Sequence, residues 1–241
     1  MNVISDAVIW HDLECGAYAV DLPLWRALAA EHGDPVIDIG AGTGRVALDL
    51  ARHGFAVAAV EHDAELAAAL AVRADRLPVR VVCADARTLT GVGPAPLMIV
   101  PMQSVQLFGG PAGRAAFLTA ARAALRPGGV LALAIADTID AAAAGDLEPP
   151  LPDMRELDGV LYSSQPIAVF DDAGATAIER LRQVIDDTGT RSSVNDVIRL
   201  DKLTAGELEA EGAAAGFTVL ARRDVPWTDE YVGSTVVMLG A

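Results

Sequence analysis

Short apolar runs alternate with amphipathic segments through the first 136 residues. The runs PVIDI (35–39), AVAAV (56–60), VRVVC (79–83), PLMIV (96–100) and VLALAIA (130–136) have the length and composition of buried strands. The segments between them predict helices over roughly Asp21 to His32, Thr43 to His53, Ala64 to Arg76 and Gly113 to Arg126. Such alternation requires parallel strand pairing, with helices on both faces of one sheet.

The pattern changes after Ala136. AAAAGDLEPPLP (141–152) is rich in Ala and Pro and is typical of a connector, and three β-rich stretches follow between about 159 and 201. The turn-forming segments DDAGA and DTGTRS separate them, which predicts an antiparallel β meander. Thr204 and Glu207 then have capping-box spacing at the start of a helix, and FTVLARR and STVVMLG follow as closing strands. We therefore expect one α/β domain, a Rossmann-like doubly wound sheet with a β cap inserted after the fifth strand.

The stretch DIGAGTGR places Gly40, Gly42 and Gly44 where the first strand meets a helix. Backbone amides converge at such a helix N-terminus, which suits a nucleotide-type ligand. The dinucleotide spacing GxGxxG fails because Arg45 occupies the place of its third glycine. A tight structural turn with no ligand is the alternative interpretation.

Two acids follow at the ends of the next strands. Glu61 lies 23 residues after Asp38, the distance at which such folds place an acid on ribose hydroxyls. Asp85 ends the third strand and could accept a hydrogen bond from an adenine amino group. A solvated carboxylate is the alternative for Glu61, and Asp85 taken alone is more often a loop acid, but together with the glycines they predict one site at the carboxyl edge of the sheet.

From about Val36 to Ala136, and again over the last 40 residues, the chain resembles the class I S-adenosylmethionine-dependent methyltransferases. The resemblance rests on VIDIGAGTGR, the acid in VEHD, CADAR, MIVPMQSVQLF and ALRPGGVLAL. It implies a seven-stranded sheet whose last strand is antiparallel, and S-adenosylmethionine as the cofactor. The residues that it implies at the cofactor are Asp38 (methionine amino group), Gly40, Ala41, Gly42, Gly44, Glu61 (ribose), His62, Asp85 (adenine), Ala86, Met102 and Gln103.

The segment WHDLECGAYAVDLPLWRALA further resembles a small-molecule subgroup whose leading segment closes over the cofactor and often begins with Tyr-Asp. His11 replaces that tyrosine here, and Tyr18 supplies a phenol nearby. We therefore expect residues 1–34 to form an N-terminal helical lid, 35–136 the cofactor-binding core, about 159–201 the inserted meander and 202–241 the closing helix and strands, all within a single domain (1–241).

Methyl transfer from a sulfonium is a direct displacement, so the protein mainly aligns the reactants and excludes water. If the acceptor is a hydroxyl, His11 is the candidate base, although a structural or exposed histidine is the alternative. Tyr18, Gln106 and Tyr162 are candidate substrate contacts. PMQS (101–104) lacks the Asn/Asp-Pro-Pro-aromatic motif of enzymes that methylate DNA adenine or protein glutamine.

The formal net charge of −15 makes nucleic acid an unlikely partner. Between Asp140 and Asp187, eleven acids and three arginines carry a net charge of −8, which indicates either a solvated acidic face or attraction of cationic acceptors. The meander is expected to cover the active site or to form a homodimer interface. No apolar run spans a membrane, and Asp6 and Asp12 stand where a secretion signal would be positive, so we expect a cytoplasmic protein.

Two cysteines, Cys15 and Cys83, form no metal-binding pattern, and Cys83 is expected in the core. The predicted function is methylation of a nitrogen or oxygen of a small metabolite with S-adenosylmethionine and without a metal. The alternatives are a non-catalytic module that senses a nucleotide or scaffolds a partner, and a nicotinamide-dependent reductase, which Arg45 disfavours. The sequence identifies neither the acceptor nor the atom that is methylated, because loops that vary freely make those contacts.

Overall fold

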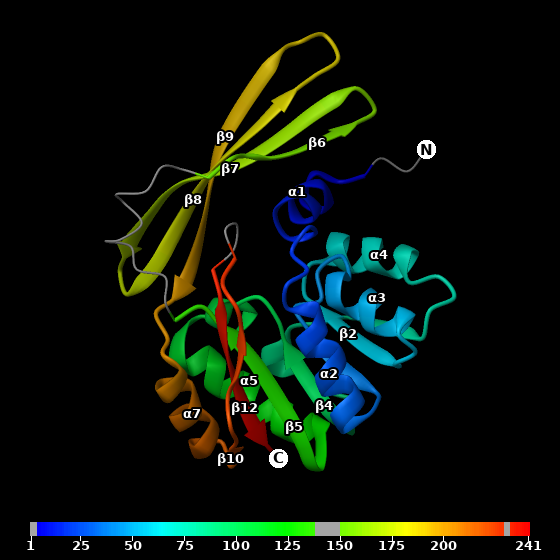
Figure 1. Cartoon of the computed structure of the whole chain (residues 1–241), viewed down its shortest axis with the longest axis vertical. Helices are drawn as coiled ribbons and strands as arrows, with labels where there is room; N and C mark the ends of the chain where they lie inside the picture. The colour runs from blue at the N-terminus through cyan, green and yellow to red at the C-terminus, as the bar shows by residue number, and fades with distance from the viewer. Residues whose placement is uncertain (1–3, 138–149, 229–231) are drawn as a thin grey trace. The chain divides into compact units, whose positions relative to one another are not determined.

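The structure is a computed structural model that describes residues 4–137, 150–228 and 232–241. The chain divides into two compact units (Figure 1). The core unit comprises Tyr18–Asp137 and Leu203–Ala241, and the insert unit comprises Met1–Ala17 and Thr138–Lys202.

The core unit is built on one mixed sheet with the strand order β10-β12-β5-β4-β1-β2-β3. Strands β1 (Val36–Ile39), β2 (Val57–Glu61), β3 (Val79–Cys83), β4 (Ala95–Val100) and β5 (Leu125–Ile135) are parallel. Strand β12 (Ser234–Gly240) runs antiparallel to β5, and it pairs with β10 (Thr218–Val219) and with the short β11 (Arg223–Val225). The predicted doubly wound sheet with an antiparallel last strand is confirmed.

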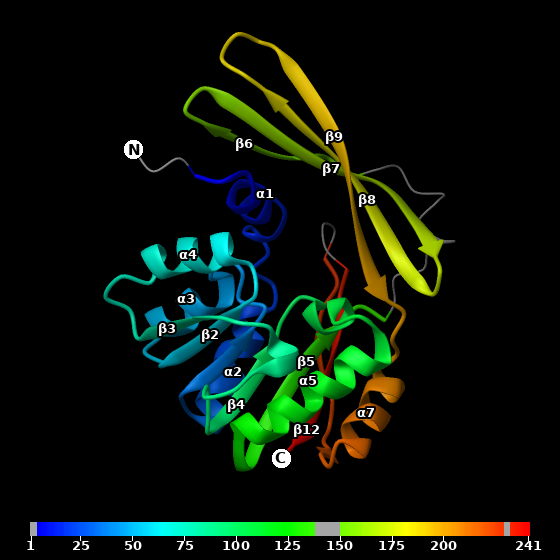
Figure 2. The same ribbon diagram turned by 180° about the vertical axis from the view of Figure 1, so that it is seen from behind.

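Helices cover both faces of this sheet (Figures 1 and 2). Helices α2 (Leu22–His32), α3 (Arg45–Arg52) and α4 (Ala64–Arg73) pack on one face, and α5 (Gly110–Ala124) and α7 (Ala205–Ala214) pack on the other. Successive strand residues alternate between the two faces. Ile37 and Ile39 accordingly join the α5 side of the core, whereas Val36 joins the α2 side. By the same alternation, the carboxylate of Asp38 belongs to the α2 and α3 side.

Three details of the core unit bear on the sequence predictions. The capping box between Thr204 and Glu207 is confirmed at the start of α7. Helix α5 ends at Ala124 rather than Arg126, because Leu125 already pairs with Ala95 in the sheet. The expectation of a core position for Cys83 is wrong, since the residue is exposed. Its strand, β3, lies at the edge of the sheet and is covered less than the central strands.

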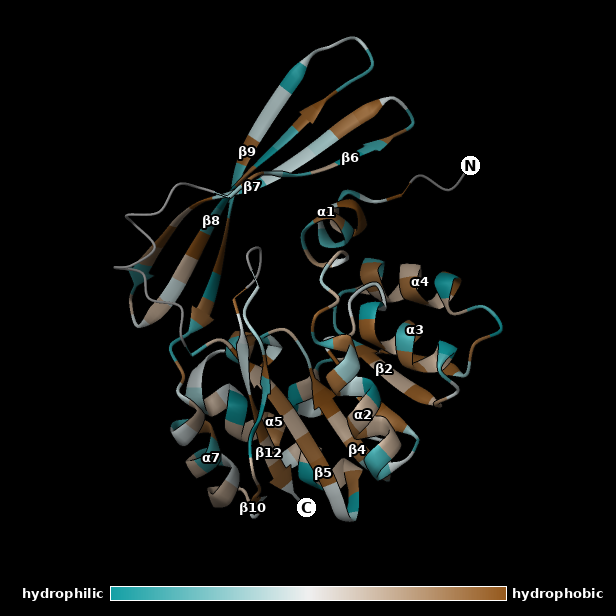
Figure 3. Cartoon of the chain, viewed as in Figure 1, coloured by the Kyte–Doolittle hydropathy of each residue, from teal (hydrophilic) through white to brown (hydrophobic). Residues whose placement is uncertain are grey.

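The insert unit contains a four-stranded antiparallel sheet with the order β6-β7-β8-β9. Its strands are β6 (Asp153–Leu157), β7 (Val160–Asp172), β8 (Ala175–Ile185) and β9 (Arg191–Asp201). The antiparallel insert after the fifth strand is thus confirmed, with β6 as a strand that the sequence analysis did not include. In Figure 3, β4 and β5 of the core unit are brown along much of their length, whereas the strands of the insert mix apolar and polar positions.

Helix α1 (Asp6–Cys15) packs on the sheet of the insert unit. The Trp10 ring meets the Tyr162 ring edge-on at a centroid distance of 5.6 Å. Glu14 accepts hydrogen bonds from Arg182 Nε at 2.7 Å and from Ser164 Oγ at 2.7 Å. The structure therefore places α1 and α2, which the sequence analysis joined in one lid, in different units. The role of residues 1–34 as a lid stays a prediction.

Other parts of the insert lie outside the described residues, including most of the predicted connector 141–152. No helix in the described part of the chain is long and apolar enough to cross a membrane.

Candidate functional site

The predicted cofactor residues gather at the carboxyl ends of four neighbouring strands. The glycine loop, residues 40–44, follows β1, and Glu61 ends β2. Asp85 follows β3, and Met102 and Gln103 follow β4. Because β1, β2, β3 and β4 are parallel, these ends share one edge of the sheet, where open α/β folds bind their ligands.

The glycine loop has left-handed backbone at Gly40, Gly42 and Gly44, with φ of 67°, 55° and 103°. A Cβ at Gly40 would lie 2.8 Å from Ser104 Oγ, and a Cβ at Gly44 would collide with Leu70 and Leu48. Packing within the protein therefore favours glycine at two of the three positions, Gly40 and Gly44. This finding agrees with the alternative hypothesis that the loop is a tight structural turn. Access for a ligand at these glycines stays a prediction.

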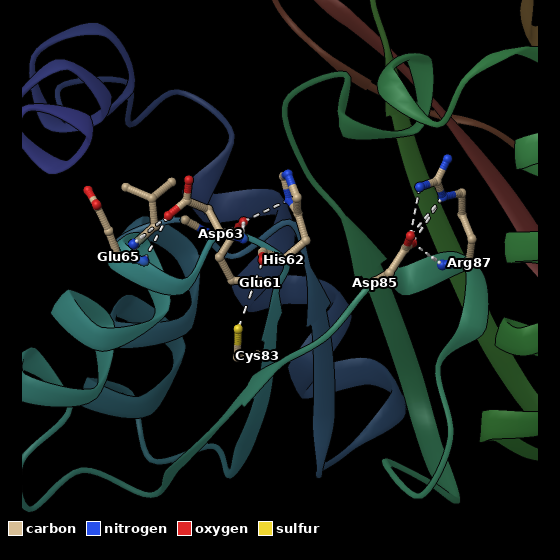
Figure 4. A network of polar contacts seen from close by, with 9 residues as sticks. Glu61, His62, Asp63, Glu65, Cys83, Asp85 and Arg87 are labelled. Atoms are coloured by element: carbon tan, nitrogen blue, oxygen red, sulfur yellow. Dashed lines mark hydrogen bonds and ion pairs between the residues drawn. The ribbon is translucent and has the colours of Figure 1, made fainter.

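Glu61 joins the glycine loop to the end of β2. Its side chain is 5% exposed, and its carboxylate accepts hydrogen bonds from Gly42 N at 2.8 Å and from Asp63 N at 2.9 Å. His62 is largely exposed, and its Nδ1 lies 3.0 Å from Glu61 Oε1 (Figure 4). A carboxylate held at the loop in this way is placed to accept further hydrogen bonds from a ligand's hydroxyl groups.

Asp85 forms an exposed ion pair with Arg87, which the sequence analysis did not identify (Figure 4). The Arg87 Nε and Nη2 atoms donate to its two carboxylate oxygens at 3.0 and 2.7 Å, and the Arg87 N–H donates at 2.8 Å. The hydrogen bonds from the Arg87 side chain are the main reason that the pKa of Asp85 falls to about 2. The motif Asp-Ala-Arg could have indicated this ion pair, because an acid that caps a short helical turn can pair with a cation two residues later.

Asp38 is a buried carboxylate at 1% exposure. Neither of its oxygens accepts a well-formed hydrogen bond within the described part of the protein. Burial raises its pKa to about 7, although the charge of Arg45 and the backbone N–H of Ala47 act to lower it. Because a buried, unpaired carboxylate is costly, this group is suited to a cationic partner supplied by a ligand.

The loop after β4 carries strained backbone at the same edge of the sheet. Met102 and Gln103 adopt left-handed φ values of 49° and 57°, and such strain often accompanies a functional site. Gln103 Nε2 donates to Ser234 Oγ at 3.2 Å. The Gln106 side chain is buried, and its carbonyl accepts a hydrogen bond from Ala136 N at 2.9 Å. That contact ties the loop to the end of β5, and substrate binding by Gln106 stays a prediction.

The remaining predicted residues divide between the two units. Ala41 and Ala86 are buried in the core unit, where Ala41 N donates to Val60 O at 3.0 Å. Tyr18 is also in the core unit, with its ring 5.0 Å from the Arg45 guanidinium. His11 on α1 and Tyr162 on β7 belong to the insert unit. Among the described residues, no group of three or more His, Cys, Asp or Glu side chains could hold a metal ion.

Residues 36–129 match the model of a family described as a methyltransferase domain. They contain β1 to β4 and the loops that carry the site. The chain has the fold of the class I methyltransferases. No curated protein matches the sequence.

Solved methyltransferase structures share this fold over almost the whole chain. An amino pentose methyltransferase of Micromonospora echinaspora with bound S-adenosylmethionine is 22% identical, with 99% of both chains covered and a TM-score of 0.74. A sugar N-methyltransferase of Streptoalloteichus is 21% identical, with 98% of this chain and 96% of that chain covered and a TM-score of 0.74. An S-adenosylmethionine-dependent methyltransferase of Clostridium acetobutylicum is 15% identical, with 96% of both chains covered and a TM-score of 0.70. At these identities the likeness establishes the fold.

Proposed function

We propose that this protein is an S-adenosylmethionine-dependent methyltransferase that acts on a nitrogen or oxygen of a small molecule. The observation that carries the proposal is the pair of buried carboxylates beside the glycine loop. Asp38 is unpaired at the end of β1, and Glu61 is held at the loop by Gly42 N. A ligand with a cationic group and vicinal hydroxyls complements both, and S-adenosylmethionine has these groups.

Each of three acids is proposed to bind a different group of this cofactor. Asp38 would hold its ammonium group, Glu61 its ribose hydroxyls and Asp85 its adenine amino group, with Ala41, His62, Ala86, Met102 and Gln103 around them. A carboxylate has about four lone-pair sites, so Asp85 can keep Arg87 and still accept a hydrogen bond from adenine. When bound, the cofactor supplies an electrophilic methyl group on a sulfonium, while the protein aligns the acceptor and excludes water.

An amine of a sugar-like molecule is the acceptor class that we favour. The amino pentose and sugar N-methyltransferases share the fold over nearly the full chain. The acidic insert would raise the local concentration of a cationic acceptor. Part of its charge is neutralised, because Asp171 pairs with Lys202 and Asp172 with Arg199. We propose Tyr18 and Gln106 of the core unit as acceptor contacts, whereas His11 as the base and Tyr162 as an acceptor contact stay predictions.

Calorimetric titration with S-adenosylhomocysteine tests the cofactor site. Loss of a hydrogen bond to a charged acceptor costs about 1.5 to 3 kcal/mol, so Glu61→Ala should raise the Kd by about ten- to a hundredfold. Glu65→Ala is the matched control, because Glu65 is an exposed acid in the first turn of α4, close by in sequence (Figure 4). An unchanged Kd in folded Glu61→Ala would remove Glu61 from the site.

Turnover separates an enzyme from a non-catalytic module on the same fold. The expected result is release of S-adenosylhomocysteine from S-adenosylmethionine in the presence of amino sugars, with a mass increase of one methyl group on the acceptor. Tight cofactor binding without turnover on any amine or hydroxyl acceptor would favour the sensing or scaffolding alternative. Binding of NADH in preference to S-adenosylmethionine would instead favour a reductase.

A further inference from the structure

A buried ion pair lies beside the glycine loop, between the segment before α2 and the start of α3. Arg45 is the first residue of α3, directly after Gly44. Its Nη1 and Nη2 atoms donate to Asp21 Oδ1 at 2.6 Å and to Asp21 Oδ2 at 2.8 Å. The two side chains are only 9% and 3% exposed. A bidentate pair of this kind, once buried, fixes the orientation of both partners.

The same pair organises the chain around it. Trp25 Nε1 donates to Asp21 Oδ2 at 2.8 Å, and Arg45 Nη1 also donates to Tyr18 O at 2.9 Å. The Arg45 guanidinium lies 5.0 Å from the centre of the Tyr18 ring. Through these contacts one arginine fastens residues 18–25 to the helix that begins where the glycine loop ends.

Arg45 and Asp21 also act on the unpaired carboxylate of Asp38. Burial is the main cause of its raised pKa; the positive charge of Arg45 opposes that rise, whereas the negative charges of Asp21 and Glu61 add to it. These are the charged groups that act on Asp38 from α3, from the segment before α2 and from the end of β2. The ionisation of Asp38 therefore depends in part on the opposing charges of Arg45 and Asp21.

We propose that Arg45 is a positioning residue of the cofactor site, which fixes the glycine loop through Asp21 and keeps Asp38 ionised for a ligand's ammonium group. The inference rests on the proposed function. If the ion pair of Arg45 and Asp21 were purely structural, its removal would change only the stability of the protein. A positioning role also changes the pH at which the ligand binds, in a direction that depends on which charge is removed.

The experiment measures the Kd of S-adenosylhomocysteine from about pH 5.5 to about pH 8 by calorimetry. In the wild-type protein, affinity should weaken roughly tenfold per pH unit below the Asp38 pKa of about 7, because binding then requires loss of a proton. Arg45→Met should move this midpoint upward and raise the Kd at neutral pH by about tenfold or more. Asp21→Asn should move the midpoint downward.

Two further variants separate charge from packing. Arg45→Lys keeps the charge but loses the bidentate geometry, so it should retain the wild-type midpoint while its affinity falls. Arg26→Met is the matched control, because Arg26 on α2 forms a bidentate pair with Asp49 on α3 at 2.7 and 2.6 Å, and neither residue is among the main causes of the Asp38 pKa shift. It should leave the midpoint unchanged.

The measurements distinguish failure of the proposed function from failure of the inference about Arg45. Absence of ligand binding by the wild-type protein at every pH would overturn the function and this inference together. Binding with the same midpoint in wild type, Arg45→Met and Asp21→Asn would overturn the inference alone. If Arg45→Met does not fold, Asp21→Asn and Arg45→Lys carry the same comparison.

Discussion

Glu14 in the insert unit and Asp38 in the core unit are both largely buried carboxylates, and their surroundings are opposite. Glu14 accepts hydrogen bonds from Arg182 and Ser164 and lies 3.6 Å from Arg180. Burial alone would raise its pKa, but the bonds and charges from these partners lower it overall. Asp38 accepts no well-formed hydrogen bond within residues 4–137, 150–228 and 232–241, and burial raises its pKa to about 7.

The difference between the two carboxylates separates a structural role from a binding role. Glu14 holds α1 on the sheet of the insert, and its interactions are satisfied within the protein. Asp38 is left unsatisfied beside a glycine loop, and a cationic ligand would remove the cost of its charged form. Destabilised groups of this kind are typical of sites that bind or react.

The largest expected effect is on packing at the glycine loop. Gly44→Val places a β-branched side chain against Leu70 and Leu48 at a left-handed φ of 103°. Overpacking and backbone strain together should cost about 3 kcal/mol or more and lower the Tm sharply. Gly174→Val in the insert has a similar φ of 90° with open space around it, so only the strain of about 1 to 2 kcal/mol applies. Equal losses of Tm would mean that packing does not explain Gly44.

The next effect concerns the attachment of α1. Glu14→Gln removes the carboxylate that Arg182 and Arg180 share and leaves them paired with Asp196 and Asp153, which should cost about 1.5 to 3 kcal/mol. Because the pKa of Glu14 is lowered in the folded protein, its contribution is present above about pH 4.5 and is lost as the pH falls through the folded value. Hydrogen exchange should show faster exchange in α1, with no change in the glycine loop. Unchanged protection of α1 at neutral pH would contradict this role.

The third expected effect is a change of stability with pH that has the opposite sign. The raised pKa of Asp38 means that its contribution to stability is fully present below about pH 3.8 and is lost as the pH rises through about 7. Asp38→Asn cannot ionise, so its free energy of unfolding relative to wild type, without ligand, should increase with pH across this range by at most about 1.4 kcal/mol per pH unit, measured as a growing difference in Tm. The same variant should lose affinity for S-adenosylhomocysteine. A Tm difference that is independent of pH would show that Asp38 titrates normally.

Much of the candidate site could be predicted because its signals are local. The apolar runs identified five parallel strands, and Asp38, Glu61 and Asp85 were found because each lies at or just beside the end of one of them. Arg87 was missed although its signal was also local, two residues from the acid that it pairs with. Strand β6 was missed because DMREL has few of the β-branched and aromatic residues that indicate strands.

The sequence by itself determined the fold class, the strand ends and the position of the glycine loop, because periodicity and turn chemistry depend on near neighbours in the chain. Only the tertiary structure decided what surrounds each group. It brought Asp21 to Arg45 across 24 residues, exposed Cys83 on an edge strand and placed α1 in the insert unit. It also left both carboxylate oxygens of Asp38 without a well-formed hydrogen bond from any described residue. The burial of a group and the charges around it depend on residues that are distant in sequence, so local sequence patterns cannot predict them.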